Sequence, residues 1–214
     1  MLRFLIVTAL LTFSATASAT TFPFNTDPFA GSNALTMPGR QIVGGESFIS
    51  FDTATDVFAL GSSVFGVGDE VHFANDVVGN LPAGGVNVIV LETLDNDGNP
   101  ATPFGAGNAA DLIASQITTP GPGFFIYFNS GLDLPRLVFS TDLSDNTADL
   151  KVLFRMTNLS GQPDALPHFT ASNVAFVPEP PTLMLLAAAG MLGVGRTTLR
   201  RRRPRTDASR IRGG

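Results

Sequence analysis

The chain has 214 residues, no cysteine, no tryptophan, 18 phenylalanines and a formal net charge of −5 at pH 7. Disulfides are therefore excluded, and stability must come from apolar burial, to which phenylalanine rings contribute large areas. The net charge hides a segregation: residues 20–177 carry 16 acidic and four basic side chains, a net of −12, whereas residues 178–214 carry a net of +6. Because such an acidic domain repels phosphate groups, it excludes nucleic acid as a partner.

Residues 1–19 follow the three-part pattern of a secretory signal peptide. Arg3 supplies a positive charge, residues 4–13 form an apolar run, and the small residues Ala17, Ser18 and Ala19 follow. The run is too short for an ordinary membrane span. We therefore expect export, with cleavage after Ala19 and a mature chain that begins at Thr20.

Residues 20–39 contain Pro, Asn and Ser and predict an irregular leader. Residues 40–177 then alternate β-favouring runs with clusters of Gly, Asn, Asp and Pro. The runs are ESFISF, TDVFAL, VNVIVLET, GFFIYFN, RLVFST, DLKVLFRMT and SNVAFV. Their length and spacing predict one exported all-β domain, an antiparallel β-sandwich or a jelly-roll-like fold.

Alternation within two of these runs predicts which side chains share a face of the sheet. The first set is Val86, Val88 and Val90. The second set is Leu150, Val152, Phe154 and Met156, and the intervening Lys151 and Arg155 are expected to face water.

One segment, GNAADLIASQI, has helical spacing instead. Asn108 can cap a helix, and Asp111 then falls in its favourable first turn. The apolar positions at helical spacing are Ala109, Leu112, Ile113 and Ile117. We expect one short helix that covers an edge or an end of the sandwich.

The run Asp95-Asn96-Asp97-Gly98-Asn99 supplies candidate ligands for a calcium ion, Asp95 and Asp97. Carboxylates on a sharply turning backbone are typical of calcium loops. The twelfth position of such a loop would be Phe104, where a bidentate Glu is required. The pattern therefore favours an Asp-Gly turn, and no cofactor is expected, although the acidic surface leaves weak calcium binding open.

No catalytic site is identifiable in the remaining candidates. His72 and His168 lack the spacing of zinc ligands. Asp142, Asp145 and Asp149 could be considered as a glycosidase pair, but the sequence does not fix their separation. The segment RQIVGGE at residues 40–46 is similar to a trypsin-like activation site, but no serine-protease triad accompanies it, so an ordinary turn before a strand is favoured.

The C-terminal segment combines prolines, an apolar run and an arginine cluster. Prolines at 178, 180 and 181 end the last expected strand, and the 16 residues of 180–195 carry no charge. A helix continued through Leu199 has 20 residues, enough to cross a membrane. Arg200, Arg201, Arg202 and Arg203 then remain cytoplasmic and leave the acidic domain outside the inner membrane.

This order of features resembles the PEP-CTERM sorting domain. The matching residues are Pro178, Glu179 and Pro180, the apolar residues 182–195, and Arg200 to Arg203. The resemblance covers residues 178–203 and implies that an exosortase, an integral-membrane cysteine peptidase of Gram-negative bacteria that make exopolysaccharide, recognises and cleaves the segment. Pro178, Glu179 and Pro180 would then be the recognition residues. The family's tails usually stop soon after the arginines, whereas residues 204–214 continue here as a basic cytoplasmic tail.

The sequence therefore predicts a non-enzymatic protein of the cell surface or extracellular matrix, held briefly in the inner membrane and linked to exopolysaccharide or biofilm. Two alternatives remain open. One is a secreted module that binds carbohydrate or calcium, and the other is a polysaccharide hydrolase with converging carboxylates in a cleft. An unprocessed single-span anchor is the alternative to the sorting signal.

Overall fold

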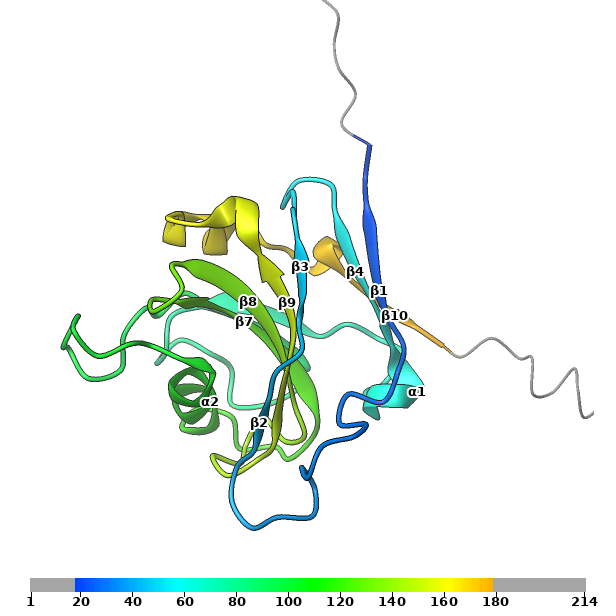
Figure 1. Cartoon of the computed structure of the whole chain (residues 1–214), viewed down its shortest axis with the longest axis horizontal. Helices are drawn as coiled ribbons and strands as arrows, with labels where there is room; N and C mark the ends of the chain where they lie inside the picture. Colours follow the sequence, from blue (N-terminus) through cyan, green and yellow to red (C-terminus); the bar gives the residue numbers. More distant parts are fainter. Residues whose placement is uncertain (1–17, 179–214) are drawn as a thin grey trace, which may run out of the picture. The chain divides into compact units, whose positions relative to one another are not determined.

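The computed structural model describes residues 18–178 (Figure 1). The first compact unit of the chain ends at Pro178. Most of the expected signal helix, the expected C-terminal membrane helix and the basic tail lie outside the described residues. Within residues 18–178, no helix is both long and apolar enough to cross a membrane.

The described chain is rich in β-structure, which confirms the expected fold class at that level. Its strands are β1 (Thr21–Phe24), β2 (Ile42–Val43), β3 (Ser47–Ile49), β4 (Val57–Gly61), β5 (Phe73–Asp76), β6 (Val88–Leu91), β7 (Gly123–Asn129), β8 (Leu134–Ser140), β9 (Leu150–Met156) and β10 (Val174–Val177). The helices are α1 (Ser62–Phe65), α2 (Ala106–Ala114) and the 3-10 turns η1 (Thr157–Leu159), η2 (Pro163–His168) and η3 (Ala171–Asn173).

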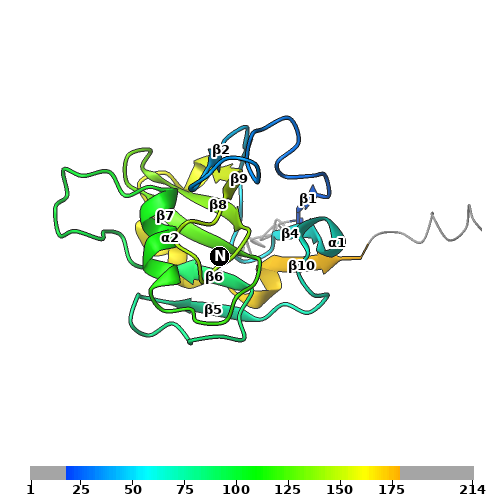
Figure 2. The same ribbon diagram turned by 90° about the horizontal axis from the view of Figure 1, so that it is seen from below.

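The strands form two sheets. The smaller sheet has the order β1-β4-β10, and the larger has the order β2-β9-β8-β7-β6-β5, with β3 also paired to β9. Figure 2 shows β9, β8, β7, β6 and β5 in this succession. The expectation of an antiparallel domain holds only for β7-β8 and β8-β9, because all the other pairs described are parallel.

Connection length explains this difference. Antiparallel neighbours can be joined by a tight turn, as at residues 130–133 between β7 and β8, whereas parallel neighbours need a crossover of about a dozen residues or more. The glycine- and asparagine-rich stretch before β6 and the segment with α2 before β7 are such crossovers. Clusters of turn residues therefore lie in crossovers as well as in hairpins in this fold.

The larger sheet is buried on both faces. On one face Phe124 and Ile126 of β7 pack with Phe58 of β4 and Phe176 of β10, so that the two sheets face each other. On the other face Phe125 and the neighbouring strands pack against α2. Figure 1 shows α2 on one side of the larger sheet and β1, β4 and β10 on the other. The helix thus covers a sheet face, not an edge or an end, and adds a third layer.

Helix α2 confirms the helical spacing found in the sequence. It begins at Ala106, and Asn108 lies inside its first turn, where the Asn108 Oδ1 accepts the Gly105 N–H at 3.1 Å. Ala109 and Ile113 are buried on the side that faces the sheet. The amide side chain therefore stabilises the helix start from within the helix instead of from the residue before it.

A β-bulge in β9 breaks the alternation that was expected there. Leu137 pairs with Phe154 and Val138 with Val152, so Leu153 is an extra residue without a partner. Side chains before the bulge, such as Val152, point to the α2 side, whereas Leu153 and Phe154 point to the smaller sheet. The four residues predicted to share a face are therefore divided between the two faces. In the other set, Val88 and Val90 share a face, but Val86 packs on the α2 side.

Residues 20–39 were expected to be irregular, and they are so only after Phe24. Residues 21–24 form β1, which pairs with β4 in parallel. The Phe22 ring lies 5.8 Å from that of Phe51, and the Phe24 ring lies 5.6 Å from that of Phe65. These two rings dock the start of the domain into the core between the sheets. Pro23 made the strand hard to recognise, but an edge strand tolerates proline.

Candidate functional site

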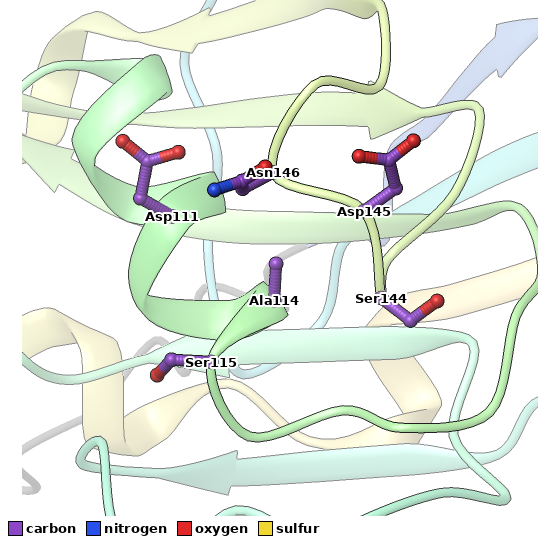
Figure 3. Close-up of a pocket in the computed structure, with 6 residues that line it drawn as sticks. All are labelled: Asp111, Ala114, Ser115, Ser144, Asp145 and Asn146. Carbon is purple, nitrogen blue, oxygen red and sulfur yellow. The ribbon is translucent and has the colours of Figure 1, made fainter.

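A shallow polar hollow lies between α2 and the loop that joins β8 to β9. Its volume is about 350 Å³. The residues that line it are Asp111, Ala114 and Ser115 from the helix and Ser144, Asp145 and Asn146 from the loop (Figure 3). Figure 3 shows the Asp111 and Asp145 carboxylates on either side of Asn146.

Both carboxylates of the hollow already have partners. Asp111 Oδ1 lies 2.9 Å from Arg40 Nη2. Asp145 Oδ1 accepts hydrogen bonds from the backbone N–H and the hydroxyl of Thr147, each at 2.7 Å. Asp145 is exposed, and the Thr147 N–H and hydroxyl, with a smaller contribution from Arg40, hold the pKa of its carboxyl below the usual value against an opposing effect of desolvation. A general acid needs a raised pKa, so the Asp145 carboxylate suits hydrogen bonding to a ligand better than protonation of one.

The other carboxylates considered as a glycosidase pair hold loops in place. Asp142 Oδ1 accepts hydrogen bonds from the Gly121 N–H at 3.1 Å and from the Ser144 N–H at 2.8 Å. Asp149 is 8% exposed and accepts the N–H groups of Leu35 and Gln41, each at 2.6 Å. Each carboxylate therefore serves a different set of backbone groups, and the structure provides no support for a catalytic pair among them.

The Asp95–Asn99 segment is a turn in which the carboxylates bind the chain's own backbone. Asp95 Oδ1 accepts the Asn96 N–H at 2.7 Å and the Asp97 N–H at 3.2 Å, and Asp97 Oδ1 accepts the Asn99 N–H at 2.8 Å. The Asp97 N–H is the main cause that lowers the pKa of Asp95. Across residues 18–178 no group of three or more His, Cys, Asp or Glu side chains is arranged to hold a metal ion.

The two histidines lie on the surface of the described chain. His72 Nε2 is 3.9 Å from a carboxylate oxygen of Glu70, and both side chains are well exposed. His168 ends η2 and is exposed. Neither belongs to a cluster of metal ligands among the described residues.

A charge cluster on β8 and β9 was missed by the sequence analysis. Glu46 Oε1 accepts hydrogen bonds from Arg155 Nε at 2.5 Å and from Arg136 Nη2. The side chains of Glu46, Arg136 and Arg155 are 6%, 12% and 25% exposed, so Arg155 does not simply face water as expected. The Arg155 guanidinium also lies 5.0 Å from the centre of the exposed Phe48 ring.

The environment of Glu46 favours its ionised form. Burial alone raises its pKa, but the hydrogen bond from its own backbone, the bond from Arg155 and the charge and bond of Arg136 outweigh burial and lower the pKa to about 2. Arg136 and Arg155 are cross-strand partners in the β8-β9 register. Glu46 therefore separates two like charges that the sheet brings together.

All four Lys and Arg side chains of residues 18–178 belong to or contact the segment 40–46. Arg40 lies within it, Arg136 and Arg155 bind Glu46, and Lys151 Nζ donates to the Gly44 carbonyl. This segment carries β2, which pairs with β9 at the sheet edge. The basic side chains of the domain are thus used to hold one edge segment, and the acidic side chains dominate elsewhere. Residues 40–46 therefore form an edge segment that is held to the larger sheet by ion pairs and hydrogen bonds, and not only the ordinary turn before a strand that was expected.

The structure also describes the residues next to the two expected cuts. The Thr20 N–H donates to Asp56 Oδ1 at 2.7 Å, and the Thr20 carbonyl accepts the Val57 N–H at 3.0 Å. At the other end β10 stops at Val177, and Pro178 is the last residue described. Glu179, Pro180 and Arg200 to Arg203 lie outside the described residues. Ala19 is described and exposed.

Comparison of the chain with protein-family models, with curated proteins and with solved structures finds no match. The resemblance to the sorting domain therefore depends on the residues of the motif at 178–203.

Proposed function

We propose that the chain is an exported, non-enzymatic protein that reaches the cell surface or the extracellular matrix of a Gram-negative bacterium through a PEP-CTERM pathway. The segment from Pro180 to Leu199 holds it in the inner membrane as a single helix. An exosortase-type peptidase recognises Pro178, Glu179 and Pro180 and releases the acidic β-rich domain, which then associates with exopolysaccharide or biofilm.

One observation carries this proposal: among the described residues, the first and last residues tied to the sheets lie next to the expected processing points. Within residues 18–178, the first residue with a backbone hydrogen bond to the sheets is Thr20, directly after the expected cut at Ala19. The last strand ends at Val177, and the compact unit ends at Pro178, directly before Glu179. Removal of residues 1–19 and of the segment after Pro178 would therefore leave every described strand intact.

The test is fractionation of the producing cell with intact-mass measurement of the protein. We expect the released protein to begin at Thr20 and to lack the segment that follows the Pro-Glu-Pro motif. Glu179→Gln should leave the protein in the inner-membrane fraction with its C-terminus at Gly214. Glu70→Gln is the matched control, because that side chain is 87% exposed within the folded unit, and it should be processed normally.

A C-terminus that remains at Gly214 in a strain with an intact exosortase would overturn the sorting proposal. Equal processing of the Glu179→Gln variant and the unmodified protein would show that the motif is not the recognition point. An uncleaved N-terminus would overturn export itself.

The polar hollow favours a second candidate function, a module that binds carbohydrate. Asp145 and Asn146 offer acceptor and donor groups at a surface hollow large enough for a sugar unit, and carbohydrate hydroxyls need such partners. A glycan array followed by calorimetry tests this candidate. Asp145→Asn should weaken binding of any glycan found, whereas Asp95→Asn, in the separate exposed turn, should leave it unchanged. Binding that survives Asp145→Asn would place the ligand elsewhere.

A further inference from the structure

The starting observation is a buried carboxylate without a cationic side chain. Asp56 is 5% exposed. The four Lys and Arg side chains of residues 18–178 are engaged around the segment 40–46, and no side-chain cation of that part of the chain lies within 4 Å of the Asp56 carboxylate. A buried charge is costly unless it is paired or strongly hydrogen-bonded.

The groups that do reach Asp56 are neutral donors. Oδ1 accepts the Thr20 N–H at 2.7 Å and the Thr55 hydroxyl at 3.4 Å, and Oδ2 accepts the Asp52 N–H at 2.8 Å. The buried Asn173 from η3 donates to the Asp56 carbonyl at 2.9 Å. Asp52 is the other titratable side chain of this turn, and its Oδ1 accepts the Ala54 N–H at 2.9 Å. The site is therefore built around a carboxylate that faces the backbone nitrogen of Thr20.

That nitrogen is held firmly at its place. The Thr20 carbonyl accepts the Val57 N–H, and the register of β1 on β4 begins with Thr21 beside Val57. Phe22, one residue further, lies 5.8 Å from Phe51 and 6.2 Å from Phe58, ring centre to ring centre. The pairing of β1 therefore keeps the Thr20 nitrogen beside the Asp56 carboxylate, and a positive charge gained by that nitrogen would lie next to the carboxylate.

We propose that Asp56 is the binding site for the ammonium group of the mature N-terminus. The inference depends on the proposed export. Hydrolysis of the Ala19–Thr20 bond consumes one water molecule, leaves a carboxylate on Ala19 and turns the Thr20 amide nitrogen into an α-amine that is protonated at neutral pH. The hydrogen bond to Asp56 then becomes a charge-assisted ion pair. Removal of the signal peptide thus completes the folded domain.

Three forms of the mature chain test the proposal in detergent. The first begins at Thr20, the second keeps Ala19, and the third begins at an Nα-acetylated Thr20; all three end at Gly214. The second form has the same charge as the first, but its ammonium group is one residue away, about 3.8 Å along the chain. The third form keeps the Thr20 N–H donor and loses the charge.

We expect the form that begins at Thr20 to melt about 3–8 °C above the other two at pH 7. The pKa of its α-amine, measured from the pH dependence of its acylation rate, should be at least about one unit above the usual value near 8. The raised pKa means that the advantage is complete below pH 8 and disappears as the pH rises through the higher value. Asp56→Asn should remove the difference between the first two forms.

If Asp56→Asn does not fold, the acetylated form still decides the question. Melting temperatures within about 1 °C for the three forms, together with an ordinary α-amine pKa, would overturn the proposal. The mass of the exported protein separates this result from a failure of the proposed function. An N-terminus other than Thr20 would contradict both the expected cut after Ala19 and the ion pair with Asp56. An unprocessed C-terminus would contradict the sorting step alone and would not affect the ion pair.

Discussion

Glu46→Gln is the substitution whose effect on stability the structure defines best. It changes one carboxylate oxygen to an amide nitrogen and keeps the size of the side chain. In the protein Glu46 Oε1 accepts hydrogen bonds from both Arg136 and Arg155. The substitution leaves two cross-strand arginines beside each other without the anion that separates them.

The magnitude follows from burial. Glu46 and Arg136 are 6% and 12% exposed, whereas Arg155 is 25% exposed and retains contact with water. Removal of one partner of a buried ion pair costs about 3–5 kcal/mol. Because glutamine keeps one acceptor and Arg155 can still be hydrated, we expect a loss of about 2–4 kcal/mol in the free energy of unfolding.

Urea denaturation of the full chain in detergent, followed by near-ultraviolet circular dichroism of the single Tyr127, measures this loss. Glu70→Gln, at an exposed position, should change the free energy by less than about 0.5 kcal/mol. Arg136→Met added to Glu46→Gln removes the more buried unpaired guanidinium, so the double variant should lose less than the sum of the two single losses by about 1–3 kcal/mol. Strictly additive losses, or a Glu46→Gln effect no larger than that of Glu70→Gln, would refute the reasoning.

The same cluster predicts a dependence on pH. Because the pKa of Glu46 is lowered from 4.5 to about 2, the cluster contributes its full stability above pH 4.5 and loses it as the pH falls towards 2. The free energy of unfolding should therefore fall less steeply between pH 4.5 and pH 2 in Glu46→Gln than in the unmodified protein. Parallel curves for the two proteins over this range would contradict the assignment.

Three further substitutions test other parts of the fold. Gly123→Ala should lower the free energy of unfolding, measured by urea denaturation, by about 1–3 kcal/mol, because a Cβ there would lie 2.4 Å from Leu143 Cδ1 and 2.8 Å from the Asn87 carbonyl oxygen. A loss below about 0.5 kcal/mol would contradict this close approach. Gly107→Ala, inside α2, should instead raise the free energy of unfolding by about 0.5–1 kcal/mol, because a Cβ there would have no neighbour closer than 3.4 Å and alanine favours the helix. A decrease would show that the helix does not accept the methyl group. Asp149→Asn should lower the free energy of unfolding by about 1–3 kcal/mol and speed amide hydrogen exchange in the loop before β2, because the N–H group of either Leu35 or Gln41 loses its acceptor. Unchanged exchange would contradict the role of Asp149 in holding this loop.

The seven β-favouring runs and the helix were predictable because their signals are local. GFFIYFN is made of glycine, aromatic and aliphatic residues up to Asn129, and that uninterrupted pattern is typical of a strand buried on both faces. The run thus contained evidence against a two-layer sandwich with one solvated face. Helix α2 followed from the spacing of Ala109 and Ile113, which pack against the sheet.

Strand pairing was not predictable from the same signals, because it depends on partners far apart in the sequence. β4 has β1 and β10 as neighbours, and nothing local in VFALG specifies either. The bulge at Leu153 is likewise set by the pairing of β9 with β8. β5, with its Asn75 and Asp76, resembles a turn more than a strand, and the Asn75 amide is used to bind the Leu166 carbonyl at 3.0 Å.

Within the candidate sites, the sequence could place charges but could not assign their partners. Glu46 and Arg155 are 109 positions apart, and only the alignment of segment 40–46 along β9 brings them together. Nothing in the sequence predicted the buried position of Asp56, because its partner is the backbone N–H of Thr20, a group that every residue except proline carries. The sequence offered one indication of these ion pairs: with only four basic side chains among 16 acidic ones in residues 20–177, each basic side chain could be expected to bind an acidic or carbonyl partner.

The topology also bears on the order of the proposed processing steps. β1 and β10 flank β4 and run parallel to it, so the chain enters the smaller sheet beside Val57 and leaves it beside Gly61, at the opposite end. The two expected cuts therefore lie at opposite ends of the smaller sheet, one before β1 and one after β10. The structure pairs β1 with β4 and brings the Thr20 N–H to Asp56 while residues 1–19 still belong to the chain. Within the proposed pathway, docking of β1 therefore does not require the cut after Ala19, and that cut adds a positive charge at a site that is already formed.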